Sequence, residues 1–181
     1  RVMCTASADQ PLKGLKFLLK AISQLRDRYP QLTLLVVGKP KEGGYTENLI
    51  KRLAIGDIVQ FVSGISTEQL VQHYNEAEIV VCPSLYEGFG LPAGEAMSCG
   101  TAVISSNGGA LPEVVGDAGL VVKAGSEQAI ADAIADLFDH PQKRAQLETA
   151  GRARIENTFC WNLAAQQFTQ YYHRMLQEKK A

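Results

Sequence analysis

The sequence lacks the features that mark several large classes of protein. Basic and acidic residues nearly cancel, with 18 Lys and Arg against 19 Asp and Glu. Domains that bind nucleic acid usually carry a basic surplus, so we expect no nucleic-acid partner. No apolar run approaches the roughly 20 residues of a membrane-spanning helix. No signal peptide is visible either. We therefore expect a globular domain without a membrane span.

Cysteine and histidine are few and dispersed. The four cysteines, Cys4, Cys82, Cys99 and Cys160, include no Cys-x-x-Cys pair, and the three histidines lie in separate polar segments. Cys4 and Cys82 fall in apolar runs, where a buried free thiol is the ordinary state. We expect no metal site, no cofactor and a reducing, cytoplasmic location.

What the chain has is a regular alternation of short β-branched runs and amphipathic segments, typical of βαβ units. Its 181 residues suffice for one domain with a real core. The run 32–37 is nearly all apolar, as in a strand covered on both faces. The sequence predicts an α/β fold with a parallel sheet. The strands are expected at 2–6, 32–37, 58–61, 79–82, 102–105 and 119–122, and the helices at 13–29, 47–53, 66–77, 92–98, from 112, 126–139, from 141 and about 161–179.

The most informative segment is EGFGLPAGE, residues 87–95, which places two carboxylates around a glycine-rich turn. Gly88 and Gly90 interrupt any helix joining Glu87 to Glu95, and Pro92 is tolerated only in a first helical turn. Glu87 is therefore expected in a loop and Glu95 near the start of a helix. Either Glu alone could simply favour the helix dipole. Together with the free N–H groups of a helix start, two carboxylates suit the phosphates and hydroxyls of a nucleotide sugar.

The longer string PSLYEGFGLPAGEAMSCG, residues 83–100, resembles the signature of the family 4 glycosyltransferases, also called group 1. These are retaining, metal-independent enzymes of the two-domain glycosyltransferase B fold, and each domain is Rossmann-like with helices on both faces of the sheet. The resemblance implies that Glu95 binds the ribose of the donor nucleotide. It implies that Glu87, as the catalytic residue, contacts hydroxyls of the donor sugar. The sugar and diphosphate would face the turn formed by Gly88, Phe89, Gly90 and Leu91.

A Lys-Gly pair after the first strand extends the resemblance. Lys13 matches a family lysine that neutralises the diphosphate, although alone it would pass for a surface lysine. The family's arginine, a few residues earlier, is missing, because loop 6–12 reads ASADQPL. Without this arginine, either the affinity for phosphate is lower or Ser7 and backbone N–H groups bind the phosphates instead.

A glycine pair follows the fifth predicted strand. Gly108 and Gly109, in NGGALPE, resemble the family's Gly-Gly-x-x-Glu segment and would let the backbone approach a ligand closely. A plain turn fits the same residues equally well. The loops 38–40 and 63–65 would line the nucleobase pocket, mostly through backbone atoms, so the sequence does not identify the base.

The last predicted helix follows Phe159-Cys160-Trp161, which resembles the family's Phe-Ser/Thr-Trp segment. Trp161 is expected to anchor packing. In the family this helix crosses back onto the N-terminal domain. Four of its side chains are therefore expected to be partly exposed here, namely Phe168, Tyr171, Tyr172 and Met175.

We therefore predict that residues 1–181 form a single nucleotide-sugar-binding domain of a retaining glycosyltransferase. An N-terminal acceptor domain is expected to be absent from this chain, which starts inside a strand-like run without an initiator Met. The isolated chain should bind donor but transfer little. The resemblance leaves open peripheral association of the parent with the inner face of a membrane.

Alternatives from other classes remain at this point. One is another enzyme of the same fold, such as a nucleotide-sugar epimerase or a phosphorylase. Another is a non-catalytic nucleotide-binding module. A Rossmann dehydrogenase is disfavoured, because no G-x-G-x-x-G follows the first strand.

Overall fold

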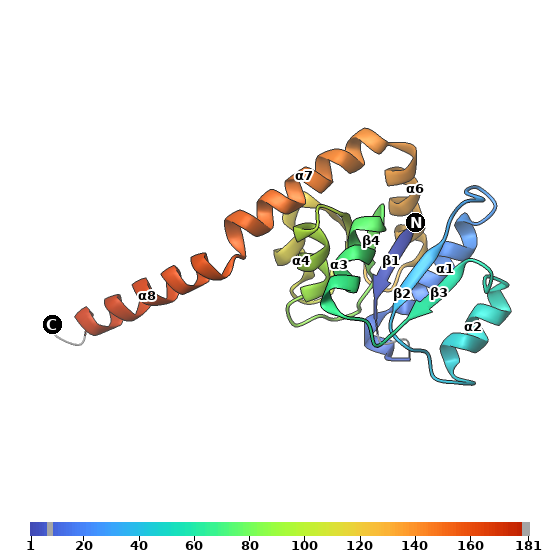
Figure 1. Ribbon diagram of the computed structural model, residues 1–181, viewed down its shortest axis with the longest axis horizontal. Helices are drawn as coiled ribbons and strands as arrows, with labels where there is room; N and C mark the ends of the chain where they lie inside the picture. The colour runs from blue at the N-terminus through green and yellow to red at the C-terminus, as the bar shows by residue number, and fades with distance from the viewer. Residues whose placement is uncertain (7–8, 179–181) are drawn as a thin grey trace.

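A parallel β-sheet forms the centre of the computed structural model, which describes residues 1–6 and 9–178 (Figure 1). Ser7 therefore lies outside the described residues. Within these ranges the sheet has six strands in the order β3-β2-β1-β4-β5-β6. Strand positions agree with the prediction to within one or two residues. The strands are β1 (Val2–Thr5), β2 (Leu34–Val37), β3 (Val59–Val62), β4 (Ile79–Cys82), β5 (Ala102–Ser106) and β6 (Leu120–Val122).

The strand order reverses between β1 and β4. From β1 the chain adds β2 and β3 on one side, then crosses to β4 and adds β5 and β6 on the other. The two central strands pair in parallel, with Val2 opposite Ile79 and Met3 opposite Val80. In open α/β sheets, ligands bind beyond the carboxyl ends of the strands at such a reversal. The topology therefore directs attention to the loops that follow β1 and β4.

Helices cover both faces of the sheet, as predicted. Side chains alternate between faces along a strand, so Cys4 joins one buried cluster and Met3 joins the other. The Cys4 face packs against helices α1 (Leu15–Leu25), α2 (Tyr45–Leu53) and α6 (Glu127–Asp139). The Met3 face packs against α3 (Thr67–Glu76), α4 (Leu91–Ser98), α5 (Leu111–Val115) and α7 (Pro141–Thr158).

The first helix is shorter than its periodicity predicted. Lys13 ends a short 3-10 turn, η1 (Pro11–Lys13), and Gly14 adopts φ = 66°, so α1 begins only at Leu15. The apolar side chains of this helix are nevertheless buried, including Leu18 and Ile22. A second 3-10 turn, η2 (Gly116–Ala118), links α5 to β6.

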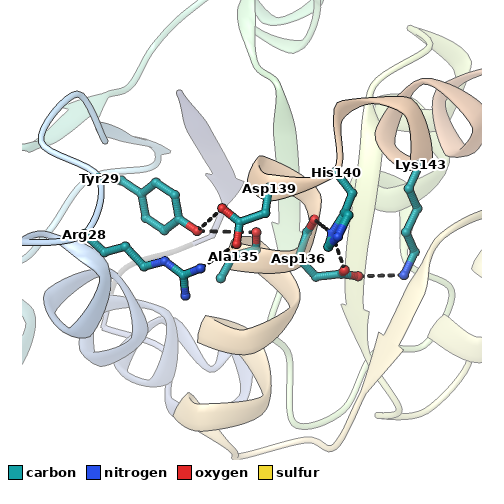
Figure 2. Close-up of polar contacts among 7 residues, drawn as sticks. All are labelled: Arg28, Tyr29, Ala135, Asp136, Asp139, His140 and Lys143. Carbon is teal, nitrogen blue, oxygen red and sulfur yellow. Dashed lines mark hydrogen bonds and ion pairs between the residues drawn. The ribbon is translucent and has the colours of Figure 1, made fainter.

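Tyr29, just beyond α1, closes a corner against the end of α6 (Figure 2). Its hydroxyl donates to Asp139 Oδ1 at 2.8 Å, and Arg28 pairs with Asp139 Oδ2 at 2.6 Å. On the adjoining turn, Asp136 pairs with Lys143 at 2.6 Å. Helices α1 and α6 each start at the carboxyl end of a strand and run back along the sheet. This corner therefore lies near the amino ends of the strands, away from the loops that follow β1 and β4.

Helix α8 (Trp161–Glu178) extends away from the rest of the molecule (Figure 1) and has no buried residue. The expected packing role of Trp161 is wrong for this chain, because its side chain is 90% exposed. The four side chains predicted to be exposed are so, namely Phe168, Tyr171, Tyr172 and Met175. No helix in the described ranges combines the length and apolar character needed to cross a bilayer.

Candidate functional site

The two carboxylates lie where the turn chemistry predicted. Gly90, at φ = 96°, ends the loop after β4, and α4 begins at Leu91 with a proline in its first turn. Glu87 lies in the loop and Glu95 on α4, with an exposed side chain. One loop and the helix after it therefore carry both groups to the carboxyl edge of the sheet.

Glu87 is held from two directions. Lys13 Nζ lies 3.1 Å from Glu87 Oε1 and 2.9 Å from Oε2, and Ser84 Oγ donates to Oε2 at 3.1 Å. The backbone joins the same two loops, since the Leu85 amide donates to the Leu12 carbonyl at 2.7 Å. Lys13 and Glu87, which the family resemblance assigns to neighbouring parts of a donor, thus form one ion pair.

Gly14 allows this contact between the loops. A Cβ at Gly14 would lie 1.9 Å from the carbonyl oxygen of Pro83, far inside van der Waals contact. Its positive φ also belongs to the region that favours glycine. The glycine after Lys13 therefore serves packing against the β4 loop.

The pair Gly108 and Gly109 has a comparable structural role. A Cβ at Gly109 would lie 2.2 Å from the carbonyl oxygen of Glu87, and one at Gly108 would lie 2.6 Å from that of Ser84. The amide of Ala110 donates to the Glu87 carbonyl at 2.9 Å. The close approach that these glycines permit here is between two backbone segments, and it fixes Glu87 from the β5 side.

Ser106, at the end of β5, ties the same two loops together. Its hydroxyl donates to the Ser84 carbonyl and accepts from the Gly108 amide at 3.2 Å. Ser106 and Ser84 are both buried. Sequence reasoning did not single out either serine. Small hydroxyl residues at or just beyond the carboxyl ends of the neighbouring strands β4 and β5 were the available signal.

The turn before α4 presents backbone donors. Within the described residues, no acceptor is recorded for the amides of Gly88, Phe89, Gly90 and Leu91. Leu91 is the first residue of α4, so its amide adds to the positive end of the helix dipole. The turn therefore suits an anionic group, as its composition suggested.

Glu95 has a partner that sequence reasoning missed. The hydroxyl of Tyr74, from α3, donates to Glu95 Oε2 at 2.9 Å. Thr5, at the end of β1, lies 3.2 Å from the same hydroxyl through Oγ1. A tyrosine in a helix of mostly polar residues was the available signal, and the structure shows it to be the buried residue of that helix.

The buried thiols beside the site are not nucleophiles. Burial raises the pKa of Cys82 to about 12 and raises the pKa of Cys4 further. Both side chains pack in the sheet as free thiols, and only a thiolate attacks readily. In the part of the chain that the structure describes, no three His, Cys, Asp or Glu side chains converge on a point suitable for a metal ion.

Asp9 joins the loops after β1 and β2. Its carboxylate accepts from the Lys41 amide at 2.6 Å and the Thr46 amide at 3.1 Å. These backbone hydrogen bonds, that of Lys41 first, lower the pKa of Asp9. A hollow of about 560 Å³ lies between the two loops, and neither Glu87 nor Glu95 lines it. The paired carboxylates instead occupy the neighbouring β1–β4 junction.

The chain is similar to several known proteins in sequence and in fold. The MMP alpha-(1->4)-mannosyltransferase of Mycolicibacterium hassiacum is 42% identical over 181 residues, which cover 97% of this chain and 43% of that protein. The C-terminal domain of a glycosyl transferase group 1 family protein from Francisella tularensis superposes with a TM-score of 0.79. It is 28% identical, with 88% of this chain and 86% of that one covered.

A third similarity concerns a structure that holds a nucleotide. Anabaena HepE in complex with UDP superposes with a TM-score of 0.83 and is 26% identical. The match covers 96% of this chain and 48% of that one. The chain thus spans less than half the length of the curated relatives that it matches. The superpositions on the Francisella and Anabaena structures confirm the Rossmann-like fold.

The family model described as glycosyl transferases group 1 matches residues 1–154, which include the Lys13 turn, both carboxylates and the Gly108-Gly109 pair. With this match over most of its length and the mannosyltransferase relative over nearly all of it, the chain belongs to the glycosyl transferases group 1 family.

Proposed function

We propose that this chain is the donor-binding domain of a retaining glycosyltransferase that moves a sugar from a nucleoside diphosphate sugar to an acceptor hydroxyl. One observation carries the proposal. Glu87, the unpaired amides of the 88–91 turn and Glu95 lie in sequence at the switch point of the sheet. Carboxylates at both ends and N–H donors between them match a sugar, a diphosphate and a ribose.

In this proposal the diphosphate lies against the 88–91 turn. Lys13 and the free amides supply positive charge to the leaving diphosphate, and fixed donors of this kind stabilise developing negative charge efficiently. Glu95 accepts hydrogen bonds from the ribose, and Glu87 orients the sugar. The similarity to HepE, whose structure contains UDP, supports a nucleotide as the ligand. We propose that no metal ion takes part.

An acceptor domain completes the proposed enzyme. The chain covers 43% of the mannosyltransferase relative, and it superposes on a domain described as C-terminal. We propose that a second domain supplies the acceptor site and that the parent works in the cytoplasm. Binding without transfer would also fit a non-catalytic module, so a transfer assay on the full-length parent separates these functions.

Calorimetric titration of this chain with UDP, GDP and ADP tests the proposal. One nucleotide should bind saturably, and Glu95→Ala should weaken it about tenfold or more, the value of a hydrogen bond to a charged group. Glu156→Ala is the matched control, because Glu156 is also a helix carboxylate but lies on α7, with its side chain 62% exposed. Equal dissociation constants for Glu95→Ala and the unmodified chain would refute the assignment. EDTA should leave binding unchanged.

A further inference from the structure

Tyr74 connects three elements at the switch point. Its hydroxyl lies 2.9 Å from Glu95 Oε2 on α4 and 3.2 Å from Thr5 Oγ1 on β1, while Tyr74 itself belongs to α3. No feature of the proposed function uses this residue. Its position between the end of β1 and the ribose-binding candidate nevertheless places it beside the site.

The ring of Tyr74 is fixed on all sides. The residue is 1% exposed and packs in the cluster that contains Met3 and Met97. Its backbone carbonyl accepts from Thr101 Oγ1 at 2.8 Å, which ties the end of α3 to the start of β5. A buried aromatic ring with two torsions has little freedom to move. The Tyr74 hydroxyl is therefore held in place and can orient a more mobile side chain, the Glu95 carboxylate.

The direction of the hydrogen bonds follows from proton counting. A phenol has one hydrogen, and Tyr74 donates it to Glu95. The Thr5 hydroxyl must then donate to Tyr74 Oη. Burial, with a contribution from the Glu95 charge, raises the pKa of Tyr74, so the phenol keeps this hydrogen at neutral pH. The relay runs from Thr5 through Tyr74 to Glu95.

This relay leaves one oxygen of Glu95 available. Oε2 is held by Tyr74, and within the described residues no partner is recorded for Oε1. Glu95 is otherwise exposed on α4, where a glutamate samples several rotamers that binding would have to restrict.

We propose that Tyr74, supported by Thr5, is a positioning residue that fixes Glu95 so that its second oxygen meets the vicinal hydroxyls of the donor ribose. The inference rests on the proposed function, because it concerns the same carboxylate. It adds that recognition of the ribose depends on a buried tyrosine that does not touch the nucleotide.

The test compares each nucleoside diphosphate, UDP, GDP and ADP, with its 2′,3′-dideoxy analogue by calorimetry. The unmodified chain should bind the analogue of its preferred nucleotide more weakly, because the analogue lacks the ribose hydroxyls that Glu95 is proposed to bind. Tyr74→Phe should reduce this discrimination by about three- to tenfold, the loss expected when one side chain must be ordered again on binding. General destabilisation would not change the ratio, since both ligands bind the same folded protein. In a Glu95→Ala background, Tyr74→Phe should have no further effect.

Two more variants keep the test sharp. Thr5→Val removes the supporting donor at nearly constant volume and should lower discrimination in the same direction. Tyr29→Phe is the matched control, because the Tyr29 hydroxyl also donates to a carboxylate, at the distant α1–α6 corner (Figure 2). If Glu95→Ala weakens binding but Tyr74→Phe leaves the ratio unchanged, the inference is wrong and the proposed function stands. If no nucleotide binds the unmodified chain, both are overturned.

Discussion

Lys13 Nζ lies about equally far from the two carboxylate oxygens of Glu87, at 3.1 and 2.9 Å. The side chains are 31% and 18% exposed, so the pair is partly shielded from water. A cation from the loop after β1 and an anion from the loop after β4 therefore neutralise each other where we place the diphosphate and sugar. In the proposed complex Lys13 interacts with two anionic groups, the Glu87 carboxylate and the diphosphate of the bound donor.

Replacing Lys13 should weaken nucleotide binding partly because the negative charge of Glu87 remains without its partner. Lys13→Ala removes a favourable cation and leaves Glu87 unneutralised beside the proposed diphosphate, so we expect nucleoside diphosphate to bind about tenfold more weakly or worse. The corresponding monophosphate should lose less. Titration calorimetry with both ligands measures the difference.

The double variant Lys13→Ala, Glu87→Gln separates the two effects. Removing the negative charge as well should restore part of the lost affinity, because like-charge repulsion disappears. Additive losses in the single and double variants would show that Glu87 does not face the phosphates.

Gly14 offers a test of the loop packing. Gly14→Ala should lower the free energy of unfolding by about 3 kcal/mol or more, because its Cβ would overlap the Pro83 carbonyl oxygen and φ is positive. Gly43→Ala is the matched control, since Gly43 has nearly the same φ, 65°, but open space around it. That change should lose only about 1–2 kcal/mol. Urea unfolding of both variants gives the comparison, and equal losses would contradict the packing argument.

The positions of the strands could be predicted from the sequence because apolar runs flanked by turns carry that information locally. Helix boundaries were less accurate where a contact between distant segments decided them. The periodicity of residues 13–29 continues through Gly14, yet α1 starts after it, since the approach of Pro83 requires glycine there. Trp161 shows the reverse case, in which a family pattern predicted packing that this chain does not make.

The site divides in the same way. Glu87 and Glu95 could be placed because Gly90 and Pro92 fix a local turn. The contacts that orient them could not, since Lys13 lies 74 positions from Glu87 and Tyr74 lies 21 from Glu95. Sequence spacing does not predict side-chain contacts between residues that belong to different βαβ units.

Tyr74 should make stability depend on alkaline pH. Its pKa is raised above the ordinary value of 10.0, first by burial, so folding favours the protonated phenol. Its contribution is therefore fully present below about pH 10 and is lost as pH rises through the higher pKa of the folded state. Tyr74→Phe should be less stable by about 1–2 kcal/mol at neutral pH. The difference from the unmodified chain should shrink above pH 10, as measured by urea unfolding from pH 8 to 11. A constant difference over that range would contradict the prediction.

Helix α8 should contribute to association rather than to stability. It buries no residue, and Phe168 and Tyr172 stack on its surface with ring centroids 6.4 Å apart and side chains 62% and 59% exposed. Contiguous exposed aromatic surface favours contact with other molecules. We expect the chain to elute at an apparent mass that rises with concentration in size-exclusion chromatography with light scattering. Phe168→Ser with Tyr172→Ser should suppress this rise.

The same two substitutions should leave thermal unfolding almost unchanged, because they alter no buried contact, and truncation after residue 159 should do likewise. Deleting α8 is a stricter test than the point variants, since it removes the exposed surface of Tyr171 and Met175 as well. A chain that stays monomeric at several hundred micromolar with α8 intact would contradict the association. A large fall in the unfolding temperature after truncation would show that α8 packs on the domain in solution.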